Sequence, residues 1–421
     1  MTEVSALGAV CALAIAIIMI LRKVPPAYGM LAGALLGGLL GGVDLINVIK
    51  MMTEGAQGIM PAVLRILAAG VLAGVLMESG AASTIATGIV RVIGEKRALL
   101  ALTFATMILT AVGVFVDIAV ITVAPIGLAI ARKAGLSRTA ILLAMVGGGK
   151  CGNIMSPNPN TIAAADAFNL PMTSVMAAGI IPAIFGILVT YLIAGMLIKK
   201  GSQVEDSDIH EIDATLLPGT LAAITAPLVT ITLLALRPVA NIAIDPMIAL
   251  PAGGIAGALA MGRFRKLNEY AVSGLGKMSG VAIMLIGTGT LAGIVANSGL
   301  KTVIINALEA SGLPPFMLAP VSGALMSAAT ASTTAGTVVA SNVFSGPILE
   351  LGVSAIAGAA MIHAGATVLD TMPHGSFFHA TGGATFMHVK ERLKILPYEC
   401  LVGLSLAIVS TLVFGVFKLF Q

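Results

Sequence analysis

The 421-residue sequence contains few charged side chains and few cysteines. Only 10% of its residues are charged, whereas 58% are hydrophobic. This composition cannot build a soluble globule, and apolar runs such as 4–21 and 216–236 are typical of membrane helices. The three cysteines, Cys11, Cys151 and Cys400, lack metal-ligand spacing, which disfavours a disulfide framework and a zinc site.

Signals for several other protein classes are also missing. The N-terminus carries no basic segment and no small-residue cleavage site follows the first apolar run, so we expect this run to be retained as a helix. No basic stripe outside the membrane supports nucleic-acid binding, and no nucleophile–base pair supports an enzyme. The four histidines between 363 and 388 are not spaced as metal ligands, so neither a metal nor a cofactor is predicted.

One pattern occurs twice, 219 residues apart. Residues 70–80 and 289–299 share Gly-x-Leu-Ala-Gly followed by Ser-Gly, and residues 145–157 and 361–373 share Met, Gly and Pro at equal spacing. In residues 145–157 and 361–373, polar residues, glycines and prolines interrupt apolar segments. Duplicated, interrupted apolar segments indicate a transporter built from two repeats. We expect the repeated glycines to permit close helix packing and not to bind a nucleotide.

Apolar stretches predict ten transmembrane helices, at about 4–22, 27–47, 61–90, 140–170, 172–198, 216–236, 246–262, 277–299, 355–389 and 396–417. Two remaining apolar stretches, about 98–131 and 314–349, are too long for one crossing. Basic residues flank the first of them on both sides, which requires an even number of crossings. Both stretches are therefore predicted to be re-entrant hairpins.

Charge then orients the chain. Placing both termini outside leaves most of the 23 Lys and Arg residues in the cytoplasm, as the positive-inside rule requires. Each half contains five spans and one hairpin, so the second half is inverted relative to the first. We predict an all-α polytopic membrane protein with inverted repeats at 1–198 and 216–421. A solvated, acidic cytoplasmic linker at 199–215 joins them, and the broken helices, about 140–170 and 355–389, lie at the membrane midplane.

Polar residues at both breaks and both hairpin tips form the candidate site. Substrate binding is assigned to Lys150, Asn153, Ser156, Asn158, Asn160, Thr161, Ser332, Thr333, Thr334, Thr371 and His374, and proton coupling to Asp370 and Asp117. Unwound backbone supplies N–H groups for an anion, and intramembrane carboxylates serve substrate contact or proton relay. Structural alternatives are a proline kink at the first break, helix capping by Asp370, neutralisation of Lys150 by Asp117, and close packing by the small tip residues.

Four of these features together resemble a known family. They are Pro125 after an acidic hairpin residue, Ser-Pro-Asn-Pro-Asn-Thr at 156–161, the segment 331–340, and Leu-Asp-Thr-Met-Pro-His at 369–374. Over most of its length the chain resembles the gluconate/proton symporter (GntP) family of the ion-transporter superfamily. The resemblance implies inverted repeats with re-entrant hairpins, a homodimer formed through a scaffold domain, and elevator-like motion in the inner membrane. It also implies proton-driven uptake of a sugar acid or hydroxycarboxylate.

The chain departs from the sugar-acid members of that family. Those members carry Pro-Pro-His-Pro-Gly-Pro at the first break, Glu in the hairpin, and Asn-Asp-Ser at the second break, where this chain has 156–161, Asp117 and 369–371. Gluconate and a smaller acid such as hydroxybutyrate, lactate or glycerate are therefore both candidate substrates. The predicted function is proton symport of a small organic-acid anion. Sodium-coupled carboxylate transport is the alternative, and cation/proton antiport is a further candidate.

Overall fold

The computed structural model describes residues 3–209, 217–300 and 312–419, together with 302, 303, 306 and 310. These residues are almost entirely helical, and their β-structure is limited to two isolated bridges, Val4 with Ser298 and Ser137 with Gln203. In the first half the helices are α1 (Ala6–Leu21), α2 (Pro26–Leu40), α3 (Leu45–Gly58), α4 (Met60–Glu78), α5 (Ala81–Ile93), α6 (Ala98–Ala111), α7 (Val116–Ala134), α8 (Arg138–Asn153), α9 (Pro159–Ala167), α10 (Met172–Ala178) and α11 (Ile180–Met196). In the second half they are α12 (Thr220–Ala240), α13 (Pro246–Ala260), α14 (Leu267–Ala296), α16 (Leu318–Thr330), α17 (Thr333–Glu350), α18 (Ala355–Gly365), α19 (Ser376–Ala384) and α20 (Val389–Ser410), which a π-helix at Thr411–Val416 extends.

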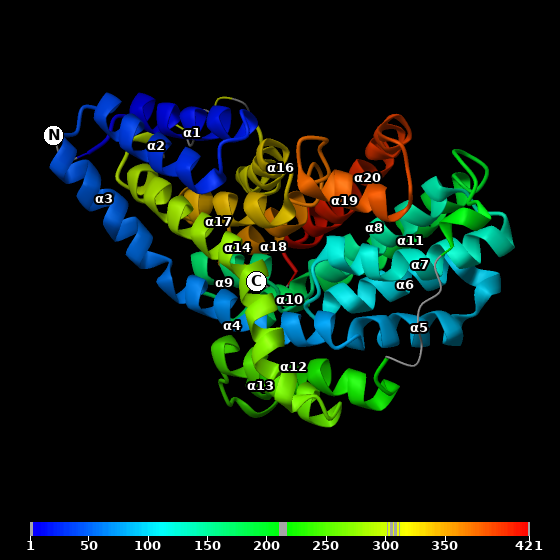
Figure 1. Cartoon of the computed structure of the whole chain (residues 1–421). Coiled ribbons are helices and arrows are strands. Elements are labelled where there is room, and N and C mark those ends of the chain that lie inside the picture. The colour runs from blue at the N-terminus through cyan, green and yellow to red at the C-terminus, as the bar shows by residue number, and fades with distance from the viewer. Residues whose placement is uncertain are drawn as a thin grey trace.

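The helices form two neighbouring bundles, with α1 to α3 at one end of the molecule and α6, α7, α8 and α11 at the other (Figure 1). The first bundle contains α1 to α4 and α12 to α14, and the second contains α6 to α11 and α16 to α20. Equivalent packing pairs recur in both halves of the chain. The α1–α2 pair in the first half corresponds to the α12–α13 pair in the second half, and α6–α8 corresponds to α16–α18. Between the halves, the α2–α14 contact corresponds to the α13–α4 contact. The same order of packing is thus used twice.

The repeated glycines let long helices approach one another closely. A Cβ on Gly74 of α4 would overlap the carbonyl oxygen of Tyr270 in α14. A Cβ on Gly293 of α14 would overlap the carbonyl oxygen of Met51 in α3. Each copy of the sequence pattern therefore lies in a tight helix contact, which confirms the packing interpretation.

Helix boundaries differ from the prediction at four places. The segment 27–47 divides into α2 and α3, because Gly42 has a φ of 86° and Asp44 accepts a hydrogen bond from the Asn47 amide at the start of α3. The segment 61–90 divides into α4 and α5 at Gly80, whose φ is 74°. Apolar composition does not reveal a helix that ends at a left-handed glycine, which is why these two divisions were not predicted. The helices predicted to begin at 277 and 396 begin at Leu267 and Val389, because their first turns are polar and carry no apolar signal.

Both predicted hairpins fold as two helices joined by a short turn. The α6–α7 turn spans 112–115, and the α16–α17 turn spans 331–332. At the predicted breaks, residues 154–158 separate α8 from α9 and residues 366–375 separate α18 from α19. Asn158 and Gly375 are the N-cap residues of the helices that follow the breaks.

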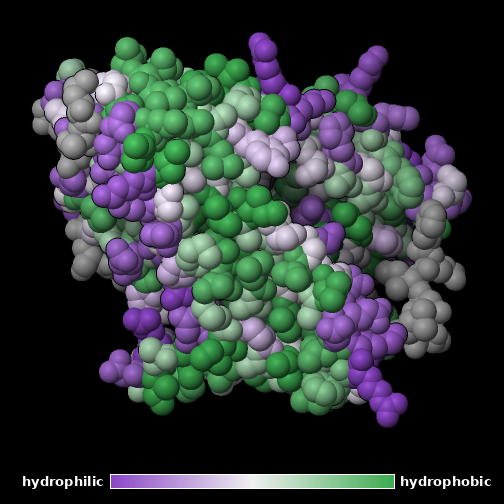
Figure 2. Space-filling model, turned by 60° about the vertical axis from the view of Figure 1, so that its left-hand side comes forward, coloured by the Kyte–Doolittle hydropathy of each residue, from purple (hydrophilic) through white to green (hydrophobic). Residues whose placement is uncertain are grey.

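Five of the described helical segments are long and apolar enough to cross a membrane. They are Met60–Glu78, Met172–Met196, Thr220–Ala240, Phe264–Ala296 and Val389–Val416. Other apolar helices, such as α1, α2 and α13, have 15 or 16 residues and are about 22–24 Å long. The count of five spans in each half therefore stays a prediction. Figure 2 shows apolar side chains over broad areas of one face, a surface suited to lipid.

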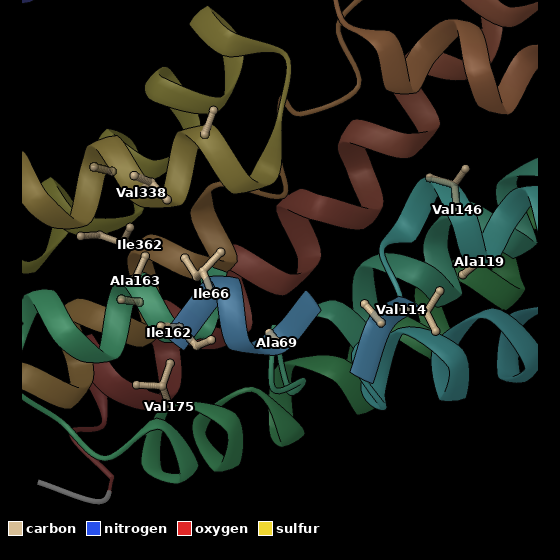
Figure 3. Packing of buried hydrophobic residues seen from close by; sticks show 14 of the residues in the cluster. Ile66, Ala69, Val114, Ala119, Val146, Ile162, Ala163, Val175, Val338 and Ile362 are labelled. Atoms are coloured by element: carbon tan, nitrogen blue, oxygen red, sulfur yellow. The ribbon is translucent and has the colours of Figure 1, made fainter. Parts of the chain in front are cut away.

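The break between α8 and α9 lies within the protein interior. Every residue of α8 is buried. In Figure 3, Ile162 and Ala163 of α9 lie beside Ile66 of α4, with Val338 of α17 and Ile362 of α18 close by. Helix α9 thus contacts a helix of the first bundle as well as its own, and this packing holds the break in position.

Part of the predicted linker binds the ends of α7 and α8. Asp206 pairs with Arg132 at 2.7 Å, and Asp208 pairs with Arg138 at 2.5 Å. Hydrogen bonds from Arg132 lower the pKa of Asp206 below its usual value. Asp208 is only 9% exposed, so the prediction of a solvated acidic run is wrong at this residue, because a basic helix start captures its carboxylate. Residues 210–215 of the linker lie outside the described residues.

Candidate functional site

Both hairpin tips and both helix breaks line one polar cavity of about 150 Å³. The lining residues are Phe115, Val116, Asp117, Asn153, Asn160, Ala331, Ser332, Thr333, Thr334, Asp370, Ser376 and Phe377. They come from α7, α8, α9, α17, α19 and the segments that precede these helices. Most of the residues selected from the sequence are therefore brought together from opposite halves of the chain.

Four helices begin at this cavity. The first turn of each of α7, α9, α17 and α19 contributes to its wall. A helix N-terminus carries unpaired N–H groups and roughly half a positive charge. Asn158 and Ser332 cap α9 and α17 through their side chains, whereas α7 and α19 have no side-chain cap. The cavity therefore offers backbone donors in a positive field, an arrangement that suits an anion.

Asp117 adds a negative charge to the same cavity. It lies in the first turn of α7 and is half-buried, and the described residues provide it with no hydrogen bond or ion pair. The alternative that it neutralises Lys150 is wrong, because the Lys150 ammonium bonds to Asp370 instead. An anion that enters the cavity must approach the Asp117 carboxylate.

Lys150 and Asp370 form a buried ion pair at the cavity wall. Lys150 Nζ lies 2.7 Å from Asp370 Oδ1, and it also donates to the carbonyl oxygens of Thr367 at 2.7 Å and Glu399 at 3.2 Å. Thr333 Oγ1 donates to the other Asp370 oxygen at 2.6 Å. Lys150 is 1% exposed and does not line the cavity. The ammonium can therefore reach a ligand only if its pair with Asp370 is broken.

Two charged residues behind Lys150 were missed by the sequence prediction. Arg392 and Glu399 of α20 are fully buried and form an ion pair at 2.9 Å. Arg392 also donates to the Phe378 carbonyl and to Thr381 Oγ1 of α19, while the Glu399 carbonyl accepts from Lys150. The pair thus connects α19 and α20 to the ion pair at the cavity. A carboxylate inside the apolar segment 396–417 was the available signal.

Asn158 has a structural position instead of facing the cavity. Its side-chain oxygen accepts hydrogen bonds from the Asn160 and Thr161 amides, at 2.9 and 3.0 Å, and from the Thr161 hydroxyl at 3.3 Å. Its side-chain nitrogen donates to Asn153 Oδ1 at 2.6 Å. Asn158 therefore caps α9 and orients Asn153 and Asn160, which do line the cavity.

Four other predicted residues also lie outside the cavity lining. One of them is Thr161, whose amide and hydroxyl donate to Asn158. Ser156 and Thr371 are buried, and neither hydroxyl has a hydrogen-bond partner among the described residues. His374 is exposed, and its Nε2 lies 3.3 Å from the Ala329 carbonyl oxygen. Over the described ranges, no group of three or more His, Cys, Asp or Glu side chains is arranged to hold a metal ion.

The sequence matches the GntP family permeases across residues 4–417. The chain belongs to this family. It is 67% identical over 418 residues to an uncharacterized transporter of Haemophilus influenzae, which covers 99% of this chain and 100% of that protein. It is 24% identical to a gluconate permease of Pseudomonas aeruginosa over 80% of each protein. It is 22% identical to the high-affinity gluconate transporter of Escherichia coli, over 93% of this chain and 95% of that protein. The resemblance read from the sequence motifs is confirmed.

The fold is similar to that of the Alcanivorax borkumensis YdaH transporter. That crystal structure superposes with a TM-score of 0.67 at 16% identity and covers 98% of both chains. The GntP permeases and these relatives are transporters and not enzymes. The chain is therefore a helical, multi-span permease of the inner membrane.

Proposed function

We propose that the protein carries a small organic-acid anion across the membrane together with protons. The observation that supports this proposal most is the meeting of four helix N-termini at a cavity that also contains Asp117. The helix N-termini attract an anion, whereas an ionised Asp117 repels it. Such a cavity binds an anion best when it also binds a proton, and this linkage is what symport requires.

The cavity can recognise both a carboxylate and hydroxyl groups. The backbone N–H groups at the starts of α7 and α19 bind the substrate carboxylate in this proposal. The hydroxyls of Ser332, Thr333 and Thr334 and the side chain of Asn160 bind the rest of the molecule. Asn160 Oδ1 is buried without a hydrogen bond from any described residue, so it can accept one from a substrate hydroxyl.

The size of the cavity favours a compact substrate. Its volume of about 150 Å³ is below the roughly 300–1,000 Å³ of most small-molecule sites. Gluconate, which two relatives are named for, and shorter hydroxy acids such as lactate, glycerate and hydroxybutyrate are the candidates. The short acids fill such a volume without rearrangement of the hairpin tips.

Proton coupling involves two carboxylates in this mechanism. Asp117 takes up a proton as the anion enters, because its charge faces the substrate directly. Protonation of Asp370 frees the Lys150 ammonium, whose positive charge then adds to anion binding. Thr333 lines the cavity and donates to Asp370, so substrate contact and the ion pair are directly connected. Lys150 therefore acts on the substrate through Asp370.

Movement of one bundle against the other supplies alternating access. We assign the scaffold to the bundle of α1 to α4 and α12 to α14, and the moving domain to the bundle of α6 to α11 and α16 to α20. The recurring packing pairs support two repeats, 1–198 and 216–421, and the predicted crossings invert the second repeat. Elevator-like motion, re-entrance of both hairpins, a homodimer through the scaffold, and both termini outside belong to the same proposal.

Sodium coupling is the second candidate. Residues with hydroxyl and amide side chains line the cavity together with Asp117, and oxygen ligands with a carboxylate suit hard cations. A sodium ion bound there would cancel the same negative charge that a proton cancels.

Uptake by proteoliposomes tests both candidates. A panel of gluconate and short hydroxy acids is offered with an inward proton gradient, in buffer where choline replaces sodium. Proton symport predicts accumulation that collapses when a protonophore is added. Accumulation that requires sodium would support the second candidate instead. Absence of accumulation for every acid, with a proton gradient and also with a sodium gradient, would contradict both.

A further inference from the structure

A second, much larger cavity lies at the other end of α8. Its volume is about 1100 Å³, and its walls come from the start of α8, the end of α11 with the turn that follows, and the start of α20. Thr139 lines this cavity, whereas Lys150 lies eleven residues, or about 16 Å, further along the same helix. The proposed transport site leaves this cavity without a role.

The interior of this cavity is apolar, and hydrogen bonds hold part of its wall in place. Leu197, Ile395 and Tyr398 contribute apolar surface to it. Glu391 of α20 accepts hydrogen bonds from the Ser202 amide at 2.6 Å and from the Ser202 hydroxyl at 2.9 Å, which hold the turn after α11 against α20. The Glu391 carboxylate is therefore already occupied by neutral donors of the fold.

Three lysines around the cavity outnumber its one carboxylate, Glu391. Lys200, Lys390 and Lys394 are exposed, and none of them forms a salt bridge with a described residue. Lys390 and Lys394 lie four residues apart in the first turns of α20. Like charges at this spacing repel each other, and a helix N-terminus disfavours cations. An anion bound between the lysines relieves both effects.

We propose that this cavity binds an acidic phospholipid, with the phosphate among the three lysines and an acyl chain against the apolar interior. Basic pockets between transmembrane helices bind anionic lipid headgroups. The neighbouring surfaces of α11 and α20 expose Leu192, Met196 and Leu401. An acyl chain can therefore continue from the cavity onto surface that already suits lipid, which a soluble anion would not use.

Lipid retention by the purified full-length protein tests the proposal. The protein in detergent is incubated with phosphatidylglycerol or with phosphatidylcholine of the same chain length, and bound lipid is counted by native mass spectrometry. Phosphatidylglycerol is expected to be retained preferentially. The triple variant Lys200→Ala/Lys390→Ala/Lys394→Ala should lower its retention about 100-fold, because each of the three lysines near an anionic headgroup contributes about fivefold.

Two further variants separate a lipid site from general surface charge. Lys96→Ala/Lys266→Ala/Lys277→Ala removes the same charge from exposed positions outside the cavity and should retain lipid as the wild type does. Val389→Trp adds bulk at the cavity wall without changing charge and should lower retention severalfold. If the first triple variant does not fold, the Val389→Trp variant and the comparison of the two lipids on the wild type test the proposal instead.

Three results would overturn the proposal. They are equal loss in both triple variants, equal retention of the two lipids by the wild type, and full displacement of phosphatidylglycerol by glycerol 3-phosphate. The last result would show that a soluble phosphate suffices without an acyl chain. The measurement needs no transport activity, so its outcome is independent of the proposed symport.

Discussion

Asp117→Asn removes the negative charge from the transport cavity while keeping the size of the side chain. A sphere of about 150 Å³ is roughly 7 Å across, so a bound carboxylate lies within about 6 Å of Asp117. At that separation and an effective dielectric constant of about 20, two like charges repel by about 3 kcal/mol, or about 100-fold in affinity. Ionised Asp117 should weaken anion binding by this factor, and asparagine should remove the penalty.

Substrate affinity compared between the two proteins checks this magnitude. Calorimetric titration at neutral pH should show that the Asp117→Asn variant binds the anion up to about 100-fold more tightly than the wild type. Equal affinities would contradict the calculated repulsion. Asp44→Asn is the matched control, because Asp44 is exposed, lies far along the chain from the cavity lining, and keeps an oxygen for its capping bond after substitution.

Transport assays then connect the binding result to coupling. The Asp117→Asn protein should exchange substrate across the membrane but should not accumulate it against a concentration gradient. A variant that accumulates substrate with the wild-type pH dependence would refute Asp117 as the coupling carboxylate. A variant that loses binding altogether would refute the electrostatic argument, since asparagine should favour the anion.

Three further predictions concern the ion pairs and the helix contacts. Lys150→Met and Asp370→Asn should each lower the melting temperature in detergent, because loss of one partner leaves a buried charge at a cost of about 3–5 kcal/mol. The double variant should melt at a higher temperature than either single variant. Additive losses of stability would contradict a direct pair. Gly74→Ala should destabilise the protein by about 1–3 kcal/mol, since the added Cβ overlaps a carbonyl of α14. Gly276→Ala is the control and should not lower stability, because no atom lies within 4 Å of its added Cβ. Equal melting temperatures of the two variants would contradict the close packing of α4 against α14. Asp166→Asn removes the negative charge that pairs with Arg65 between α9 and α4, so it should speed counterflow exchange severalfold. Lys50→Ala breaks only the exposed pair with Glu54 and should leave exchange unchanged.

Local sequence was enough to locate the polar centre of the molecule. Glycine, asparagine and proline cannot continue an apolar helix without exposing backbone groups, so the breaks after Asn153 and before Ser376 were visible as composition. The hairpin tips were visible for a related reason, because Asp117 and the hydroxyls at 332–334 interrupt long apolar stretches. The glycines at 70–74 and 289–293 lie in long apolar segments without the strand–turn–helix context of a nucleotide loop, which correctly indicated packing.

The roles of individual side chains could not be read in the same way. Asn158 and Asn160 are chemically identical and two residues apart, yet one caps α9 and the other lines the cavity. Lys150 and Asp370 were assigned to the anion and the proton separately, although their side chains bond to each other. Their pairing joins positions 220 residues apart, and no local pattern encodes such a contact.

Composition and the doubled pattern by themselves indicated a helical membrane protein with two related halves, because lipid permits few backbone arrangements. The electrostatic character of the site depends on the fold, because the residues that create it come from both halves of the chain. Four helix starts that are scattered along the chain meet at one cavity, with Lys150 withdrawn into an ion pair and Asp117 left facing inward. Such a field depends on the distances and directions between helices, and these arise from packing across the whole molecule.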